Sequence, residues 1–403
     1  MIRKISSNQN LQVGFVLIFA FLVLLLNISS LSISYKEALN LFVNSSLLSY
    51  LTQFSTYIFG FNDYALRLPF LIFYILSGIL MYKVTENFFR YDKDRILNLA
   101  LFLALPGVIS ASLLVNSSIV VLFFVLLYIY IFQKTQKHNE YLLVFCLFID
   151  SSFAIVYLAL FFWSLKYKDT RLMLISLALF TISMYIFGFD SGGKPKNYFL
   201  DTFGTYATIF SPLIFLYLLY AIYRISINKE EKNLIYYISA TALFISFLFS
   251  FRQKILIEDF APLVVISLPL MLKIFLNSYR VRLKEFRKKY NVFIFFVLFM
   301  LAINLFFTFY NKILYKYIPN PSKHLVYKHH VAKDLANYLK TKDINNIKTN
   351  KEMQLRLKFY NINEGNDYIM SKTKIYEYDE KIDIKYFDRI IDTYYIKNIE
   401  NDK

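Results

Sequence analysis

Residues 35–70 read YKEALNLFVNSSLLSYLTQFSTYIFGFNDYALRLPF, and this stretch separates two long apolar segments of the chain. One apolar segment ends at about Ile28, and the next begins at about Ala65. Between them apolar side chains recur at helical spacing, and charged residues interrupt the pattern. A segment with one apolar face and one polar face lies along a membrane surface rather than crossing it. We therefore predict amphipathic helices in an outer loop that covers residues 29–64.

The composition indicates a polytopic membrane protein, because 57% of the residues are hydrophobic and only 18% are charged. Apolar runs long enough to cross a bilayer recur between residues 11 and 310. The fold class that we predict is all-α and polytopic, with about 10–12 membrane helices. The single cysteine, Cys146, lies inside an apolar run, so no disulfide framework is expected.

The net charge of +17 does not indicate nucleic-acid binding, because many of the basic residues lie in short loops between the apolar runs. Arg3 and Lys4 precede the first run and predict a cytoplasmic N-terminus. The densest basic segment, residues 280–289, is predicted to be cytoplasmic as well. This is possible only if residues 141–167 form a hairpin that turns at Asp150-Ser151-Ser152. The chain after residue 310 is then predicted to lie on the opposite face of the membrane.

The composition changes after Asn311, where the long apolar runs end. We predict a membrane domain over residues 1–310 and a small α/β domain over residues 311–403. The helices and strands expected in the second domain follow from local apolar patterning. The expected helices are 331–340 and 352–359, and the expected strands are 346–349, 367–371 and 389–395.

The order of span, acidic residue, amphipathic loop and GFNDYALRLPF resembles the first outer loop of the GT-C glycosyltransferases. The resemblance is greatest to the branch that holds protein O-mannosyltransferases and the aminoarabinose transferase of lipid A. It implies transfer of a sugar from a polyprenyl-phosphate carrier to a glycan, lipid or protein acceptor. Two alternatives stay open: a non-catalytic relative that binds lipid or organises envelope-glycan assembly, and a transporter of lipid-linked sugars.

The resemblance implies that Glu37 is the catalytic carboxylate, since it occupies the place of the acidic motif in the first outer loop. The first acid of that motif is replaced here by Lys36. Because the amphipathic helices would enclose Glu37, desolvation is expected to raise its pKa, partly opposed by nearby cations such as Lys36 or Arg252. Asp63 and Arg67 belong to the stretch that is similar to the family pattern G-x-x-E-x-x-x-R-L-P. They are candidates for a supporting role that orients the loop, and Arg67 at the start of a span could instead reach the interface.

Two more polar residues are supporting candidates in the membrane part. Asn116 falls where relatives often carry a second acid, and an amide cannot act as a base. Asp150 is an ionisable residue within an apolar run, which makes it a functional candidate. Relatives commonly have a lysine there, and this chain reads IDSSFA. A hydrogen-bonded turn explains Asp150 equally well.

Basic residues on the outer face are candidates for holding the donor phosphate, because the leaving phosphate carries negative charge. Arg252 and Lys254 lie in FRQKILIEDFAPLVVISLPLML, which resembles the family segment where a basic residue precedes a proline-containing span. Lys194 and Lys196, in DSGGKPKNYF, are expected to join them. Pairing with lipid headgroups is the alternative role for Arg252 and Lys254, and a plain flexible loop is the alternative for Lys194 and Lys196.

The expected location is the bacterial inner membrane, with a cytoplasmic N-terminus and a periplasmic C-terminal domain. The expected partners are a polyprenyl-phosphate-linked sugar, the acceptor and membrane lipids, and no nucleic acid. His329 and His330 are adjacent, but two histidines alone are weak evidence of a metal site. No metal ligands are predicted, and dependence on a divalent metal is left open.

Overall fold

The computed structural model describes residues 7–188, 191–192, 194–227, 232–324, 326–376 and 378–399. The chain divides into two compact units, and each unit combines two separate segments. The first unit contains Met1–Leu22 and Phe70–Leu305, and the second contains Val23–Pro69 and Phe306–Lys403. The loop over residues 29–64 thus groups with the C-terminal segment. The predicted domain boundary at residue 310 stays a prediction.

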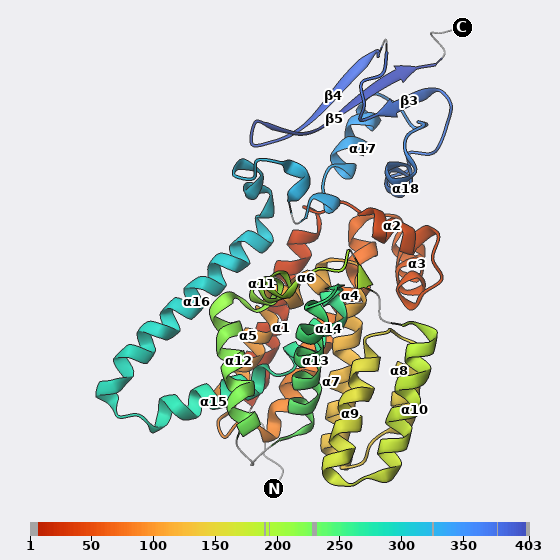
Figure 1. Cartoon of the computed structure of the whole chain (residues 1–403). Helices are drawn as coiled ribbons and strands as arrows, with labels where there is room; N and C mark the ends of the chain where they lie inside the picture. Colours follow the sequence, from red (N-terminus) through yellow and green to blue (C-terminus); the bar gives the residue numbers. More distant parts are fainter. Residues whose placement is uncertain are drawn as a thin grey trace. The chain divides into compact units, whose positions relative to one another are not determined.

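Most of the described chain is helical, and Figure 1 labels the elements in chain order. The helices are α1 (Ser7–Ile28), α2 (Tyr35–Phe42), α3 (Leu47–Phe59), α4 (Asp63–Val84), α5 (Asp92–Leu103), α6 (Pro106–Leu113), α7 (Ser117–Thr135), α8 (Glu140–Cys146), α9 (Phe153–Tyr167), α10 (Thr170–Ile186), α11 (Phe199–Phe210), α12 (Pro212–Ile227), α13 (Leu234–Ser250), α14 (Ile257–Val265), α15 (Leu268–Val281), α16 (Arg287–Phe309), α17 (Ala332–Thr341) and α18 (Lys351–Phe359). The strands are β1 (Ser191–Gly192), β2 (Lys254–Ile255), β3 (Tyr368–Ser371), β4 (Glu380–Tyr386) and β5 (Arg389–Asn398).

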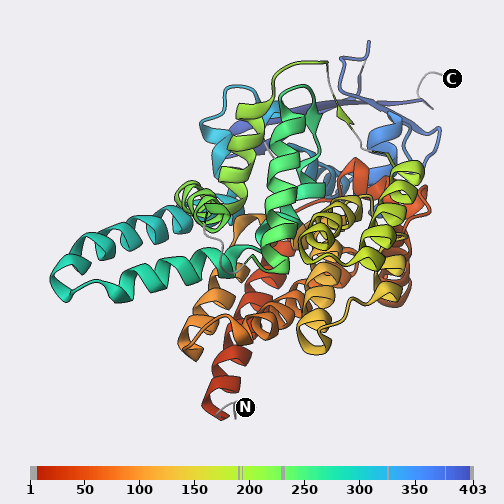
Figure 2. The same ribbon diagram turned by 60° about the horizontal axis from the view of Figure 1, so that its bottom comes forward.

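Several helices have the length and apolar composition of membrane spans. Among the described residues, four helices are long and apolar enough to cross a membrane, and the count rises to seven if each bent helix pair is one span. The helices over Gln9–Ile28 and Lys284–Phe309 are only 11% and 6% buried in their most apolar windows. Such exposed apolar helices suit a hydrocarbon surrounding rather than water. Figure 2 shows α15 and α16 meeting at the turn around Lys284.

The predicted reversal within residues 141–167 is confirmed. α8 ends at Cys146 and α9 begins at Phe153, and the Tyr157 hydroxyl donates a hydrogen bond of 2.8 Å to the Leu143 carbonyl. A straight helix would separate residues fourteen positions apart by about 21 Å. The chain therefore turns back between the two helices. α9 then packs against α10 in the first unit (Figure 1).

The predicted amphipathic helices of the outer loop are α2 and α3. Ser34 and Ser46 cap their N-termini, and Gly60 ends α3 with a positive φ of 79°. The buried face of α3 carries hydroxyl side chains, whereas its exposed face carries Tyr50, Phe54 and other large apolar side chains. An apolar face that points away from the protein is typical of a helix lying in a membrane interface.

The C-terminal segment packs α17 and α18 together and carries a three-stranded antiparallel sheet in the order β3-β5-β4. The predicted helices and the strands around β3 and β5 are confirmed. The predicted strand over residues 346–349 is wrong, because only isolated bridges from Asn346 and Lys348 form there. β4 was not predicted.

Candidate functional site

Glu37 is part of a capping box at the start of α2. The Ser34 side chain accepts a hydrogen bond from the Glu37 amide, and the Glu37 carboxylate accepts one of 2.7 Å from the Ser34 amide. The Ser34 hydroxyl donates a further bond of 3.0 Å to the same carboxylate. The local sequence therefore fixes this carboxylate at the helix N-terminus, where negative charge is favourable.

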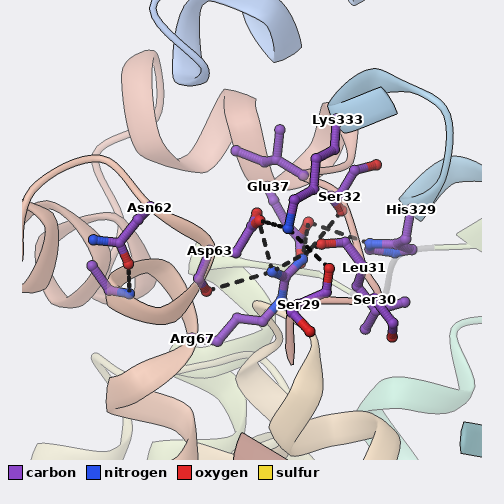
Figure 3. A network of polar contacts seen from close by, with 12 residues as sticks. Ser29, Ser30, Leu31, Ser32, Glu37, Asn62, Asp63, Arg67, His329 and Lys333 are labelled. Carbon is purple, nitrogen blue, oxygen red and sulfur yellow. Dashed lines mark hydrogen bonds and ion pairs between the residues drawn. The ribbon is translucent and has the colours of Figure 1, made fainter. Parts of the chain in front are cut away.

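Basic side chains surround the Glu37 carboxylate within the second unit (Figure 3). The Nδ1 atom of His329 lies 3.3 Å from Glu37 Oε2, which makes an ion pair when the imidazole is protonated. The Nη2 atom of Arg67 lies 3.9 Å from the same oxygen. Glu37 is only 2% exposed. Its charge is thus balanced inside the protein rather than by water.

The second acid of the loop, Asp63, is equally well paired. Its Oδ2 lies 2.7 Å from the Lys333 Nζ, and its Oδ1 lies 3.5 Å from Arg67 Nη1. The Tyr360 hydroxyl donates a hydrogen bond of 3.0 Å to Oδ1. Arg67 consequently stands between the two carboxylates, and Figure 3 shows its guanidinium among them.

Two buried arginines also hold the backbone before α2. Arg67 donates a bond of 3.1 Å to the Ser32 carbonyl, and Arg356 donates a bond of 2.9 Å to the Ile33 carbonyl. The Ser32 amide donates to the His329 carbonyl, and the Ile33 amide donates to Tyr360. The segment that leads to Glu37 is therefore bonded on both sides by residues from distant parts of the chain.

The electrostatics of Glu37 differ from a simple expectation for an enclosed acid. Burial alone raises the pKa of a carboxyl group, and the sequence predicted a raised pKa. That prediction is wrong: burial acts upward, but His329, Arg67 and the Ser34 amide together hold the pKa of Glu37 well below its usual range. A carboxylate of such low basicity is suited to accepting hydrogen bonds and attracting cations more than to removing a proton.

The four bases expected to hold a phosphate meet on a small ribbon in the first unit. β1 and β2 pair antiparallel with Gly192 opposite Lys254, and the Lys196 amide donates a bond of 3.2 Å to the Arg252 carbonyl. Lys194, Lys196, Arg252 and Lys254 are all exposed. Within the described part of the chain, none of these four side chains is paired with a carboxylate. The ribbon therefore presents a concentrated positive charge.

Asn116 and Asp150 have local structural roles in the first unit. The Asn116 side chain caps α7 by accepting a bond of 2.9 Å from the Ser118 amide. The Asp150 side chain accepts a bond of 2.9 Å from the Ser152 amide and another from the Ser152 hydroxyl. Both side chains satisfy backbone groups at a turn or a helix start.

Sequence reasoning missed His329, Lys333, Arg356 and Tyr360, all of which come from the C-terminal segment. No local motif marks them, and only the histidine pair at 329–330 was noted. Among the described residues, no group of three or more His, Cys, Asp or Glu side chains is placed to hold a metal ion.

Comparison with known proteins bears on the loop and the helices that follow it. The family described as dolichyl-phosphate-mannose-protein mannosyltransferase matches residues 44–185. The matched range begins after Glu37 and includes Asp63, Arg67, Asn116 and Asp150. A search of curated proteins found no match to the chain. The resemblance inferred from the sequence is thereby confirmed, and residues 44–185 match a domain of the GT-C superfamily.

Proposed function

We propose that this protein transfers a sugar from a polyprenyl-phosphate carrier to a glycan, lipid or protein acceptor on the periplasmic face of the bacterial inner membrane. The observation that carries the proposal is the family match over residues 44–185, which supports a membrane glycosyltransferase of the GT-C type. The exposed apolar helices are consistent with a membrane location. The GT-C arrangement with about 10–12 spans belongs to this proposal.

In the proposed reaction, Glu37 orients the acceptor by accepting a hydrogen bond from its nucleophilic group. Its low pKa keeps it ionised at neutral pH and favours this role over general-base catalysis. Asp63 and Arg67 support it, because Arg67 lies between the two carboxylates and also holds the backbone before α2.

The ribbon of β1 and β2 is proposed to bind the donor phosphate. Preorganised cations stabilise the negative charge that develops on a leaving phosphate. Lys194, Lys196, Arg252 and Lys254 are exposed and come from two segments held together by backbone hydrogen bonds. Asn116 and Asp150 retain only a supporting structural role in the proposal.

A non-catalytic relative that binds lipid or organises glycan assembly is the second candidate. The observation that favours it is the complete pairing of Glu37 and Asp63 with cations of the protein itself. An ion-paired, buried carboxylate is a common structural device as well as a catalytic one.

A transfer assay with a polyprenyl-phosphate sugar as donor tests the proposal on the full-length protein. Wild-type protein should transfer the sugar, and Arg252→Ala with Lys254→Ala should weaken donor binding. Charge-assisted contacts contribute on the order of 1.5–3 kcal/mol each when desolvated, and these exposed ones should lie at or below the lower end. Lys284→Ala, which removes a base outside the ribbon, is the matched control. Unchanged donor binding in the double variant would remove the ribbon from the site, and absence of transfer with any donor would favour the non-catalytic relative.

Membrane orientation gives an independent test. A reporter fused after Tyr310 should be periplasmic, and one fused within residues 282–286 should be cytoplasmic, because basic residues concentrate around that turn. Alkaline phosphatase and green fluorescent protein fusions report the two sides. Both fusions on one side would contradict the proposed orientation.

A further inference from the structure

The second unit contains a cavity of about 210 Å³, and neither Glu37 nor Asp63 is among its lining residues. The first two turns of α18 contribute Glu352 and Arg356 to the lining, and the short 3-10 turn before α17 contributes Tyr327 and Lys328. The remaining lining includes Lys372, which directly follows β3, and Asp392, which lies on β5. Three cations therefore face two carboxylates in one small space.

Arg356 is the unusual residue of this cavity. It is only 6% exposed, and it donates to the Ile33 carbonyl, the His330 carbonyl and the Ser32 hydroxyl. Each of these acceptors is uncharged. Within the described residues no carboxylate forms an ion pair with this guanidinium, and its Nη1 makes no hydrogen bond. Burial lowers the pKa of Arg356, and the carboxylates of Glu352 and Glu37 oppose this effect only from beyond ion-pair distance.

A buried cation that no carboxylate contacts is costly, because its charge is removed from water and only partly balanced by more distant carboxylates. Proteins generally pair such charges. An anionic group bound in the cavity would supply the missing partner and would use the free Nη1. The N-terminus of α18, which begins at Lys351 and has Asn350 as its cap, adds a favourable field for an anion.

The other charged groups are arranged differently. Lys372 donates bonds of 3.0 and 2.9 Å to the two oxygens of Asp392, and the Tyr327 hydroxyl donates one of 2.6 Å to the same carboxylate. This closed network is neutral overall and presents donors and acceptors side by side. A sugar hydroxyl both donates and accepts, so such a network suits it.

The volume limits the ligand. About 210 Å³ equals the share of roughly seven liquid water molecules at ~30 Å³ each, and it is below the size typical of pockets for drug-sized ligands. One monosaccharide ring with an acidic substituent is of the right size, whereas a chain of several sugar units would extend outside the cavity.

We propose that this cavity binds an acidic monosaccharide unit, with its carboxylate or phosphate on Arg356 and its hydroxyls against the Lys372–Asp392 pair. The sugar identity rests on the proposed function, because a glycosyltransferase acts on glycans. The anion site rests on the contacts of Arg356 and does not depend on catalysis.

Isothermal titration calorimetry on the full-length protein in detergent tests the proposal with four probes: D-glucuronate, D-glucose 1-phosphate, inorganic phosphate and D-glucose. At least one acidic sugar should bind more tightly than both inorganic phosphate and glucose. Preference for glucuronate would identify a carboxylate as the anionic group, and preference for glucose 1-phosphate would identify a phosphate.

Variants connect that binding to the cavity. Arg356→Lys should weaken binding of the preferred acidic sugar about tenfold, because a lysine cannot reproduce the guanidinium geometry. Lys328→Ala should weaken it about threefold, since Lys328 is an exposed cation of the lining. Glu352→Gln should strengthen binding about twofold, because it removes a negative charge that repels the anionic ligand. Lys340→Ala, an exposed lysine on α17 outside the lining, should leave it unchanged.

The opposite signs at Lys328 and Glu352 keep the test informative even if Arg356→Lys fails to fold. Equal binding of glucose, equal binding of inorganic phosphate, or no binding of either acidic sugar at 10 mM would overturn the proposal. Binding that is insensitive to all three lining variants would overturn it as well. Because binding is measured without transfer, loss of the cavity proposal and loss of the proposed enzymatic function give different results.

Discussion

Sugar transfer should fall roughly a hundredfold or more when Glu37 becomes glutamine, because the acceptor loses the charged group that orients it. Glutamine keeps the size of the side chain and can still accept a hydrogen bond from the Ser34 amide, but it lacks the negative charge that faces Arg67 and His329. Donor binding should be retained, because the proposed phosphate contacts lie on the ribbon of β1 and β2. The rate of transfer and the donor affinity are measured on the same preparation.

Lys36→Gln is the matched control, since Lys36 is the exposed neighbour of Glu37 on α2. A stability measurement separates chemistry from folding. The pKa of Glu37 is lowered on folding, so its contribution to stability is present above its ordinary value of about 4.5 and is lost as the pH falls below that value. The Gln variant should lack this acid-dependent loss. Wild-type rates of transfer in the Glu37→Gln protein would exclude Glu37 from the site.

Arg67→Ala should reduce the free energy of unfolding by about 3–5 kcal/mol. The guanidinium is completely buried, lies between the carboxylates of Glu37 and Asp63, and donates to the Ser32 carbonyl. Its removal leaves two buried acids with fewer counter-ions and a carbonyl without its donor. The midpoint of denaturant unfolding in detergent measures the loss.

Arg67→Lys should recover part of this stability, because the charge remains but the two-pronged geometry does not. Arg224→Ala, which truncates an exposed arginine, is the control for loss of a cation and should change stability by less than about 1 kcal/mol. If Arg67→Ala lowers the free energy of unfolding no more than Arg224→Ala does, the cluster does not hold the loop together.

The local features of this chain could be predicted from sequence because their causes are local. The reversal at Asp150 could be predicted because residues 141–167 must enter and leave the membrane on the same side to keep the basic segment 280–289 cytoplasmic. The Asp150 side chain accepts a hydrogen bond within the turn, which agrees with the structural one of its two interpretations. The helices α2 and α3 follow from apolar spacing and from Ser34 and Ser46 as caps. β4 was missed although Ile382 and Ile384 alternate with charged residues, a pattern that indicates a strand.

The composition of the Glu37 cluster could not be predicted in the same way. His329 and Lys333 supply the counter-ions of Glu37 and Asp63, and they come from a segment almost three hundred residues later in the chain. Nothing in their local sequence indicates that pairing. The prediction of a raised pKa for Glu37 failed for this reason, since it included the effect of burial but not these distant cations.

The pairing of residues 32–33 with residues 329–360 also has a consequence for biosynthesis. The hydrogen bond from Arg356 to the Ile33 carbonyl joins residues 323 positions apart. At a synthesis rate of about 5–20 residues per second, the ribosome needs roughly 15–65 s after Ile33 to produce Arg356. For most of that interval Glu37, Asp63 and Arg67 exist in the nascent chain without His329, Lys333 or Tyr360. The second unit therefore completes its polar interior only near the end of translation, and a chain that stops before residue 329 retains the loop without these partners.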